Sequence, residues 1–312
     1  MKYSGSIAME PLISSDIMQK VRRLEIRSRQ LVSDSLAGSF QSVFKGSGMN
    51  FDEVRAYFPG DEIRTIDWNV TARTGAPHVK KFVEERELTI MLLIDISASG
   101  NFGSTDGSKR EMMAELGAVL AFSAINSNDK VGLVLFSDFI ELYIPPNKGR
   151  SHILRLIREI LYYKPRGKKT DLVLPLDFVT KICKRKSVAF LISDYVFIDD
   201  FAAGLAALKS KMLICGRRHD LISVIVSDPR ERDLIDCGLL TIEDGETGKQ
   251  VEIDTSDPLV RKRWRELAGQ RRDTLFHALR GAGIDTLDLS TEHSYMEPLL
   301  SFFGARRRRL AR

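Results

Sequence analysis

The feature that most constrains the fold is an apolar run at residues 88–94 that ends in the carboxylate of Asp95. A second run of the same kind, at 187–193, ends in Asp194. Continuous apolar runs of this length are typical of strands that are covered on both faces, as in parallel sheets. From residue 88 onward such strands alternate with helical patterns. The alternation predicts an α/β fold with a doubly wound, mostly parallel sheet and helices on both faces.

The individual elements follow from the periodicity of apolar residues. Strands are expected over 88–95, 130–137, 139–144, 187–194, 221–227 and 284–289, and helices over 109–127, 151–163, 171–183, 199–210, 258–280 and 294–304. The second and third strands are separated by too few residues for a parallel crossover, so we expect an antiparallel pair at the sheet edge. Turn residues between two short β-like segments predict an inserted hairpin over about 239–254.

The chain before residue 88 is expected to form two smaller parts. Ile17, Val21, Leu24 and Leu31 follow a helical spacing, which predicts one amphipathic helix within 1–36. Glycines, prolines and short β-like pieces at 40–44 and 78–83 predict a small β-rich subdomain over 37–87, with Trp68 and Phe82 as packing anchors. The α/β domain then spans 88–312.

Composition restricts the location and the partners of the protein. The chain has 312 residues and a net charge of +5, and five arginines near its end account for that excess: Arg306, Arg307, Arg308, Arg309 and Arg312. The remainder is near neutral, so basicity is weak evidence for nucleic acid, and we expect no specific nucleic-acid partner. Three cysteines without a Cys-x-x-Cys pair, and no apolar run near the roughly 18 residues of a spanning helix, predict a cytoplasmic protein without a transmembrane segment.

Oxygen-bearing side chains gather where the predicted strands end. Asp95, Ser97 and Ser99 follow the first core strand. Ligand sites in open α/β sheets lie just outside the carboxyl ends of the strands, and carboxylates and hydroxyls are ligands that suit Mg2+ or Mn2+. Asp and Ser are also common in turns and helix caps, so this segment alone leaves both interpretations open.

Two further segments favour the cation site. Thr170-Asp171 opens the predicted helix over 171–183, and Asp194 closes another apolar strand. Asp-x-Ser-x-Ser, a later Thr-Asp and a strand-ending Asp, in this order, resemble the metal-ion-dependent adhesion site of von Willebrand factor A domains. The resemblance implies five ligands for Mg2+ or Mn2+, namely Asp95, Ser97, Ser99, Thr170 and Asp194. The three hydroxyls are neutral, so the bound ion would keep positive charge and accept an Asp or Glu of a partner.

The block upstream of the first core strand narrows the resemblance. It contains Phe58-Pro59-Gly60-Asp61 and Asp67-Trp68-Asn69 and continues through 79–88. This block resembles the signature of an uncharacterised bacterial family, domain of unknown function 58, which joins it to a von Willebrand-like domain. Genes of that family typically accompany MoxR-type AAA+ ATPases. The resemblance implies a non-enzymatic interaction module, an adaptor or co-chaperone of such an ATPase, with the ATPase or its client protein as the partner.

Two departures from the usual von Willebrand pattern bear on the site. Lys168 and Lys169 precede Thr170 where a pair of glycines is common, and Tyr195 follows Asp194 where glycine is common. The lysines either weaken cation binding through like-charge repulsion or help to attract an acidic partner. The sequence leaves these two effects open.

Enzymatic alternatives lack required residues. An aspartyl phosphatase needs a second carboxylate two residues after the first, where this chain has Ser97, and a phosphate-binding loop fails at Ser108 and Arg110. The five histidines form no metal or triad spacing. A metal-dependent hydrolase that uses the same cluster is the alternative function. A third alternative is peripheral contact of the C-terminal arginines with anionic lipid or nucleic acid, although a solvated terminus is the expectation and no aromatic residues interleave them.

Overall fold

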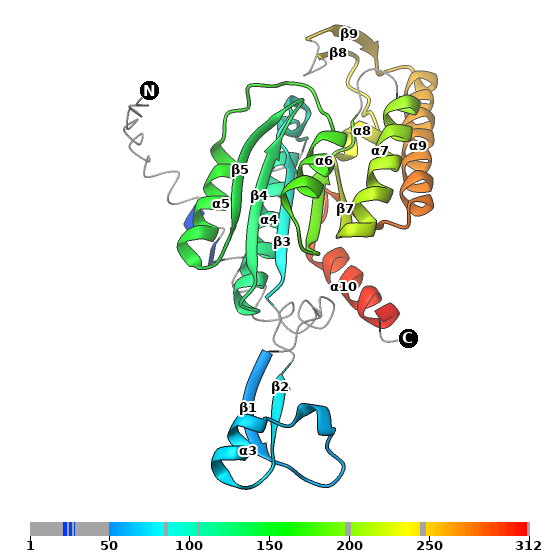
Figure 1. Ribbon diagram of the computed structural model, residues 1–312. Coiled ribbons are helices and arrows are strands. Elements are labelled where there is room, and N and C mark those ends of the chain that lie inside the picture. Colours follow the sequence, from blue (N-terminus) through cyan, green and yellow to red (C-terminus); the bar gives the residue numbers. More distant parts are fainter. Residues whose placement is uncertain are drawn as a thin grey trace, which may run out of the picture.

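A six-stranded sheet forms the centre of the protein in the computed structural model (Figure 1). The structure describes residues 21–23, 25, 26, 28, 50–83, 87–104, 107–196, 201–243 and 248–310. The strands lie in the order β10-β7-β6-β3-β4-β5 and are Asp285–Ser290, Asp220–Ser227, Val188–Ser193, Thr89–Asp95, Lys130–Phe136 and Ile140–Asn147. All neighbours are parallel except β4 and β5. The predicted α/β fold with an antiparallel edge is confirmed.

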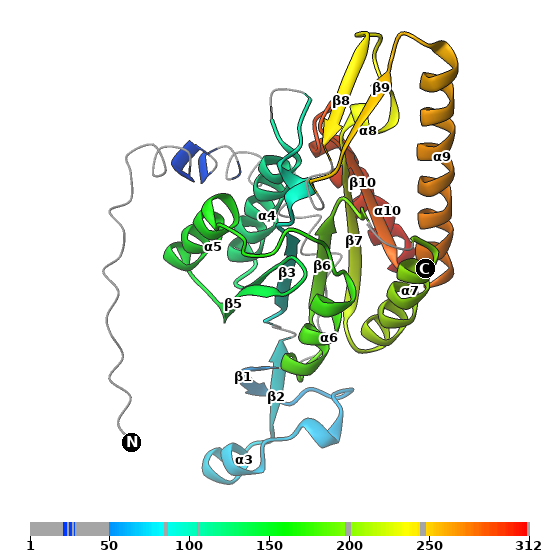
Figure 2. The ribbon, with the colours of Figure 1, turned by 90° about the horizontal axis from the view of Figure 1, so that it is seen from above.

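Helices cover both faces of this sheet (Figure 2). One face packs against α4 (Lys109–Asn126), α5 (Arg150–Tyr162) and α10 (Met296–Leu310), and the other against α6 (Val173–Ile182), α7 (Phe201–Arg218) and α9 (Pro258–Gly281). Successive residues of β3 serve the two faces in turn, because side chains alternate along a strand. Ile90, Leu92 and Ile94 belong to the first core, and Met91 and Leu93 to the second.

The helix that follows the first core strand is buried on nearly all sides. The side chain of Ser108 accepts from the backbone N–H of Glu111, and the Glu111 carboxylate accepts from the backbone N–H of Ser108, which together cap the start of α4. Gly117 allows α5 to approach, since an added Cβ would lie 3.3 Å from the Cδ1 atoms of Ile160 and Ile94. This close packing fixes α4 directly behind the ends of β3 and β4.

The described part of the upstream block forms a second, small unit. β1 (Asn50–Ala56) pairs antiparallel with β2 (His78–Val83), which confirms the strand predicted at 78–83. A short helix, α3 (Trp68–Thr74), lies between them in the subdomain that was predicted to be β-rich. Asp67 starts that helix by accepting from the backbone N–H groups of Asn69 and Val70. The proposed packing role of Trp68 is wrong, because its exposed fraction is 66%.

Some sequence predictions fall on residues outside the described part of the chain. They include the strand at 40–44, the side chain of Phe82 and most of the helix predicted within 1–36. Residues 21–23, 25, 26 and 28 are helical. Val21 joins the first core, and the Glu25 carboxylate accepts from Arg150 Nε at 2.6 Å.

The C-terminal part extends the predicted pattern. The inserted hairpin is present as β8 (Leu239–Glu243) and β9 (Gln250–Asp254). α10 continues to Leu310, so the described arginines belong to a helix and not to a frayed end. The expected exposure to solvent is confirmed for Arg307, Arg308 and Arg309 and is wrong for Arg306. Arg306 is 7% exposed and binds Asp220 and Asp285 at the edge of the sheet. Among the described residues, no helix is both long and apolar enough to cross a membrane.

Candidate metal centre

The carboxyl ends of three neighbouring strands bring most of the predicted site together. Asp95 ends β3, opposite Phe136 at the end of β4, and Ser193 ends β6 on the other side. Asp95 and Ser97 are buried, Ser99 and Thr170 are half-buried, and the side chain of Asp194 is 1% exposed. The backbone N–H of Asp171 donates to the carbonyl of Ser137, which attaches the Thr170 loop to the same edge of the sheet.

Hydrogen bonds hold the Asp95 carboxylate in place. Its Oδ1 accepts from the backbone N–H of Ser97 at 2.9 Å, and its Oδ2 accepts from the Ser193 hydroxyl at 2.6 Å. The hydroxyls of Ser97 and Ser99 lie 3.0 Å apart. Burial, and then the negative charge of Asp194, raise the pKa of Asp95 to about 6. A cation between these groups would relieve that repulsion.

The loop that carries Thr170 is attached to the Asp95 loop by its backbone. The N–H of Ala98 donates to the carbonyl of Lys168 at 3.1 Å. The preceding residue, Gly167, donates to Glu141 Oε1 at 2.8 Å, and an added Cβ there would lie only 2.0 Å from Asp138 Oδ1. A glycine is thus required one residue before the two lysines that depart from the usual pattern. Both lysines are exposed.

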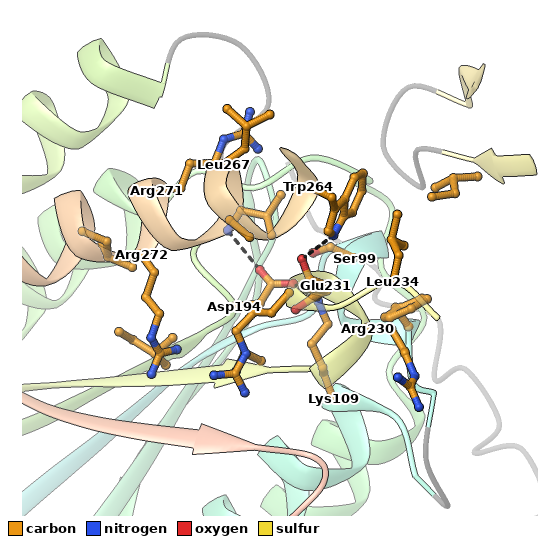
Figure 3. Close-up of a pocket in the computed structure, with 18 of the residues that line it drawn as sticks. Ser99, Lys109, Asp194, Arg230, Glu231, Leu234, Trp264, Leu267, Arg271 and Arg272 are labelled. Carbon is orange, nitrogen blue, oxygen red and sulfur yellow. Dashed lines mark hydrogen bonds and ion pairs between the residues drawn. The ribbon is translucent and has the colours of Figure 1, made fainter. Parts of the chain in front are cut away.

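A lysine that the sequence analysis did not nominate lies inside the site. Lys109, at the start of α4, has no exposed surface, and its Nζ donates to Asp194 Oδ2 at 2.5 Å and to a carboxylate oxygen of Glu231 (Figure 3). Burial by itself would lower the pKa of this ammonium, but the two carboxylates outweigh burial and raise it. Asp194 is consequently paired with a protein cation.

The five candidate ligands fit Mg2+ or Mn2+, although the Lys109 ammonium competes with an ion for Asp194. Two carboxylates and three hydroxyls supply the hard oxygen atoms that these ions prefer, and they leave room for water or an outside ligand. Within the described residues no cluster of three or more His, Cys, Asp or Glu side chains has the arrangement of a metal site. A hydroxyl-rich site is compatible with that finding. Lys109 competes for Asp194.

Tyr195 explains one departure from the von Willebrand pattern. Its φ is 57°, in the left-handed region that glycine adopts most easily. The side chain is nevertheless buried, and its hydroxyl shares a hydrogen bond with the Ser223 hydroxyl at 2.7 Å. Packing of the ring in the second core therefore stabilises a backbone conformation that is unfavourable for tyrosine, directly after Asp194.

A short helix, α8 (Pro229–Arg232), links the site to the C-terminal half. Asp228, which caps it, accepts from the backbone N–H of Ser104 at 2.9 Å and from the Thr291 hydroxyl at 2.9 Å. The indole N–H of Trp264 on α9 donates to the carbonyl of Glu231 at 3.0 Å. These contacts fix Glu231 beside Lys109 and place α9 next to the metal-site loops.

A cavity of about 850 Å³ opens beside this cluster. Ser99, Lys109 and Asp194 line it together with residues of α8, β8 and α9 (Figure 3). No local pattern in the sequence indicates this cavity, because its walls come from segments that are more than a hundred residues apart.

Comparison with known proteins places the chain in a family. Residues 53–274 match the model of the family described as protein of unknown function DUF58. The chain belongs to this family. An uncharacterized protein of Mycobacterium tuberculosis (strain ATCC 25618 / H37Rv) is 30% identical over 290 residues, which cover 92% of this chain and 89% of that protein. An uncharacterized protein of Mycobacterium avium is 28% identical over 167 residues, 53% of this chain and 94% of that protein.

Solved structures with a related arrangement are distant in sequence. The conserved hypothetical protein BatB from Bacteroides thetaiotaomicron is 12% identical with a TM-score of 0.42, and the match covers 71% of this chain and 99% of that one. The SpRpn10 VWA domain is 12% identical with a TM-score of 0.38, and the match covers 69% of this chain and 94% of that one.

The site residues that sequence reasoning missed are Lys109, Glu231 and Asp228. The segment around Lys109 was predicted to start a helix and was tested as a phosphate-binding loop, but Lys109 itself was given no role in the site. One available signal was the cap formed by Ser108 and Glu111, since it starts a helix at Lys109 immediately after the Asp95 loop. No local pattern pointed to Glu231, because its role depends on the path of the chain after β7.

Proposed function

We propose that this protein is a non-enzymatic, metal-dependent interaction module. The observation that carries the proposal is the set of two carboxylates and three hydroxyls at one edge of the sheet. Asp95, Ser97, Ser99, Thr170 and Asp194 would hold Mg2+ or Mn2+. When bound, the ion would supply a positive centre that accepts an acidic side chain from a partner.

The partner in this proposal is a MoxR-type AAA+ ATPase or a client of that ATPase. Support for this partner is the resemblance of the upstream block to families whose genes accompany such ATPases. The protein would act as an adaptor or co-chaperone in the cytoplasm, where its three unpaired cysteines would remain reduced. A specific nucleic-acid partner is not part of the proposal.

Calorimetric titration with Mn2+ and Mg2+ tests the metal. The wild type should bind one ion, and Asp95→Ala should bind none, because this substitution removes a carboxylate from the centre of the cluster. Asp171→Ala is a matched control, since Asp171 lies in the same loop region and only caps α6 through the N–H groups of Val173 and Leu174. Equal binding by wild type and Asp95→Ala would remove the proposed site.

Capture of the ATPase tests the partner. The purified MoxR-type ATPase should be retained by the immobilised protein in Mg2+ and released by a chelator, because its carboxylate completes the coordination shell. Asp95→Ala, checked for folding by circular dichroism, should lose this capture. Retention by the mutant in chelator would assign binding to another surface, with the 51–87 block as the first candidate.

The non-enzymatic part has its own test against the hydrolase alternative. Purified protein with Mg2+ should hydrolyse nucleotides, phosphoesters and peptides no faster than buffer. Turnover that depends on metal and is abolished by Asp194→Ala would establish the hydrolase instead.

A further inference from the structure

The cavity beside the metal-site residues has an apolar interior. Trp264 and Leu267 line it from α9 (Figure 3). Phe276 of the same helix and Leu240 and Ile242 of β8 also line it. Leu267 is 43% exposed, so apolar surface of the helix remains open to solvent. A volume of about 850 Å³ is in the range of pockets that accept ligands or bulky side chains.

The residues that line the cavity carry a net positive charge. Five basic residues line the cavity, Lys109, Arg230, Arg232, Arg271 and Arg272, against three acidic residues, Asp194, Glu231 and Glu243, a difference of two positive charges.

Part of this charge is already neutralised within the protein. Lys109 is paired with Asp194 and Glu231, and Arg272 is paired with Asp288. For Arg230, Arg232 and Arg271, the described part of the chain offers no carboxylate partner. These three arginines make the cavity lining complementary to a negatively charged occupant.

The apolar interior and the metal-site residues are parts of one surface. Ser99 and Asp194, two of the nominated ligands, line the same cavity as Trp264 and Phe276. An occupant whose carboxylate reaches the metal site would have its neighbouring side chains beside the cavity. The arginines would then face any further negative charge on the same segment.

We propose that the cavity docks an extended acidic segment of a partner protein, with a bulky apolar side chain of the segment inside it. The proposal rests on the proposed function in one respect, because one acidic side chain of the segment is the group that reaches the metal. It adds the sequence class of the partner: Asp or Glu residues close to Leu, Ile, Phe or Met. The apolar side chain supplies buried area, and the flanking acids pair with the unpartnered arginines.

A displayed library of random heptapeptides, selected on the full chain in Mg2+, tests the sequence class. Enriched peptides should carry an acidic residue within two positions of a bulky apolar residue. The most enriched peptide is then titrated against the Trp68→Phe variant, whose single remaining tryptophan, Trp264, lies in the cavity wall. Its fluorescence should change with peptide concentration, since the indole borders the occupant.

Matched variants test the cavity itself. Ala268→Phe fills the cavity from α9 and should lower the affinity for the peptide at least about tenfold. Gln270→Phe, on the same helix but outside the cavity, should leave that affinity unchanged. Arg271→Glu should lower the affinity similarly, whereas Arg280→Glu at the far end of α9 should not. Leu267→Ser replaces Ala268→Phe if that variant does not fold, because Leu267 is already partly exposed.

The outcomes separate this inference from the proposed function. Mn2+ titration must stay unchanged in Ala268→Phe and Arg271→Glu. Peptide binding that the cavity variants weaken but a chelator leaves unchanged would support docking in the cavity and overturn its link to the metal. Metal-dependent capture of the ATPase that is unchanged in both cavity variants would overturn the inference and leave the proposed function standing. If no peptide is selected and dodecanoate quenches the fluorescence of Trp264, the inference of a docked peptide segment is overturned and a small amphiphile is the occupant.

Discussion

Lys109 lies where a metal ion and an ammonium group compete for the same carboxylate. Its Nζ is 2.5 Å from Asp194 Oδ2, and the side chain has no exposed surface. Opposite charges interact strongly at such a distance when water is excluded. The charge of this one side chain therefore sets how much negative charge remains for an added cation.

Replacement of Lys109 by Met should raise the affinity for Mn2+ at least about tenfold, since both neighbouring carboxylates lose their protein cation. The metal-free variant should lose about 3 kcal/mol of stability, because buried carboxylates remain unpaired. Calorimetric titration and urea unfolding, with and without Mn2+, measure the two effects. Lys148→Met, at a surface pair with Glu87, is the control. Unchanged affinity in Lys109→Met would contradict the competition.

Asp129 gives a pH-dependent prediction away from the site. It is 3% exposed, its Oδ1 accepts from the backbone N–H of Leu88 at 2.8 Å, and burial raises its pKa from 3.8 to about 6. The folded state therefore favours the protonated acid. The contribution of this group to stability is present below about pH 4 and is lost as the pH rises through 6.

Asp129→Asn should accordingly be more stable than the wild type at pH 8, by at most about 3 kcal/mol. The amide oxygen can still accept from Leu88, and no charge is buried. Urea unfolding of both proteins between pH 5 and pH 8 measures the difference. The advantage of the variant must shrink as the pH falls, and a constant difference would refute the assignment to Asp129.

At the scale of elements, β5 positions the loop that carries Thr170. Glu141 on β5 is buried, and one of its oxygens accepts from the Ser137 hydroxyl and from the backbone N–H groups of Arg166 and Gly167. An edge strand thus anchors a loop that follows α5. The metal-site geometry depends on this anchor, although Glu141 is not one of the nominated ligands.

Glu141→Ala should cost about 2 kcal/mol of stability, because buried donors lose their acceptor. Hydrogen exchange at residues 166–171 should accelerate, and Mn2+ affinity should fall through the displacement of Thr170. Glu159→Ala, which removes a partly exposed pair with Arg158, serves as the control. Normal exchange in the 166–171 loop of Glu141→Ala would show that the anchor is dispensable.

For the whole molecule, the C-terminal helix is tied to the edge of the sheet by charge. Arg306 binds Asp220 at the start of β7 and Asp285 at the start of β10, the latter at 2.7 Å. Arg309 also reaches Asp285, at 2.8 Å. Two of the four arginines at 306–309 are therefore used within the protein, which leaves less charge for an anionic surface.

Arg306→Ala should destabilise the protein by about 3 kcal/mol, because Asp220 loses its arginine partner and Asp285 keeps only Arg309. Arg308→Ala, an exposed position on the same helix, should change stability by less than about 0.5 kcal/mol. Thermal or urea unfolding compares the two variants. Equal effects would mean that the arginines act only through overall charge.

The fold was largely predictable from the sequence, because strands and helices are specified by apolar patterns within short segments. The run that ends in Asp95 and the run that ends in Asp194 identify buried strands, and the helical spacing between them gives the alternation of a parallel sheet. Errors arose where local patterns were weak. Asp67 starts a helix in a segment expected to be β-rich, and Trp68, the first residue of that helix, is exposed and not a packing anchor.

The oxygen-bearing residues that end the strands can be identified from local sequence patterns, and they meet because parallel strands share one carboxyl edge. Which charges surround them depends on how distant parts of the chain pack. Lys109 is 85 residues from Asp194 and 122 from Glu231, and these contacts exist because α4, β6 and α8 pack at the same edge. The cavity likewise joins Ser99 to Phe276. Local periodicity specifies the elements, whereas such distant side chains come together only through the packing of helices on the sheet.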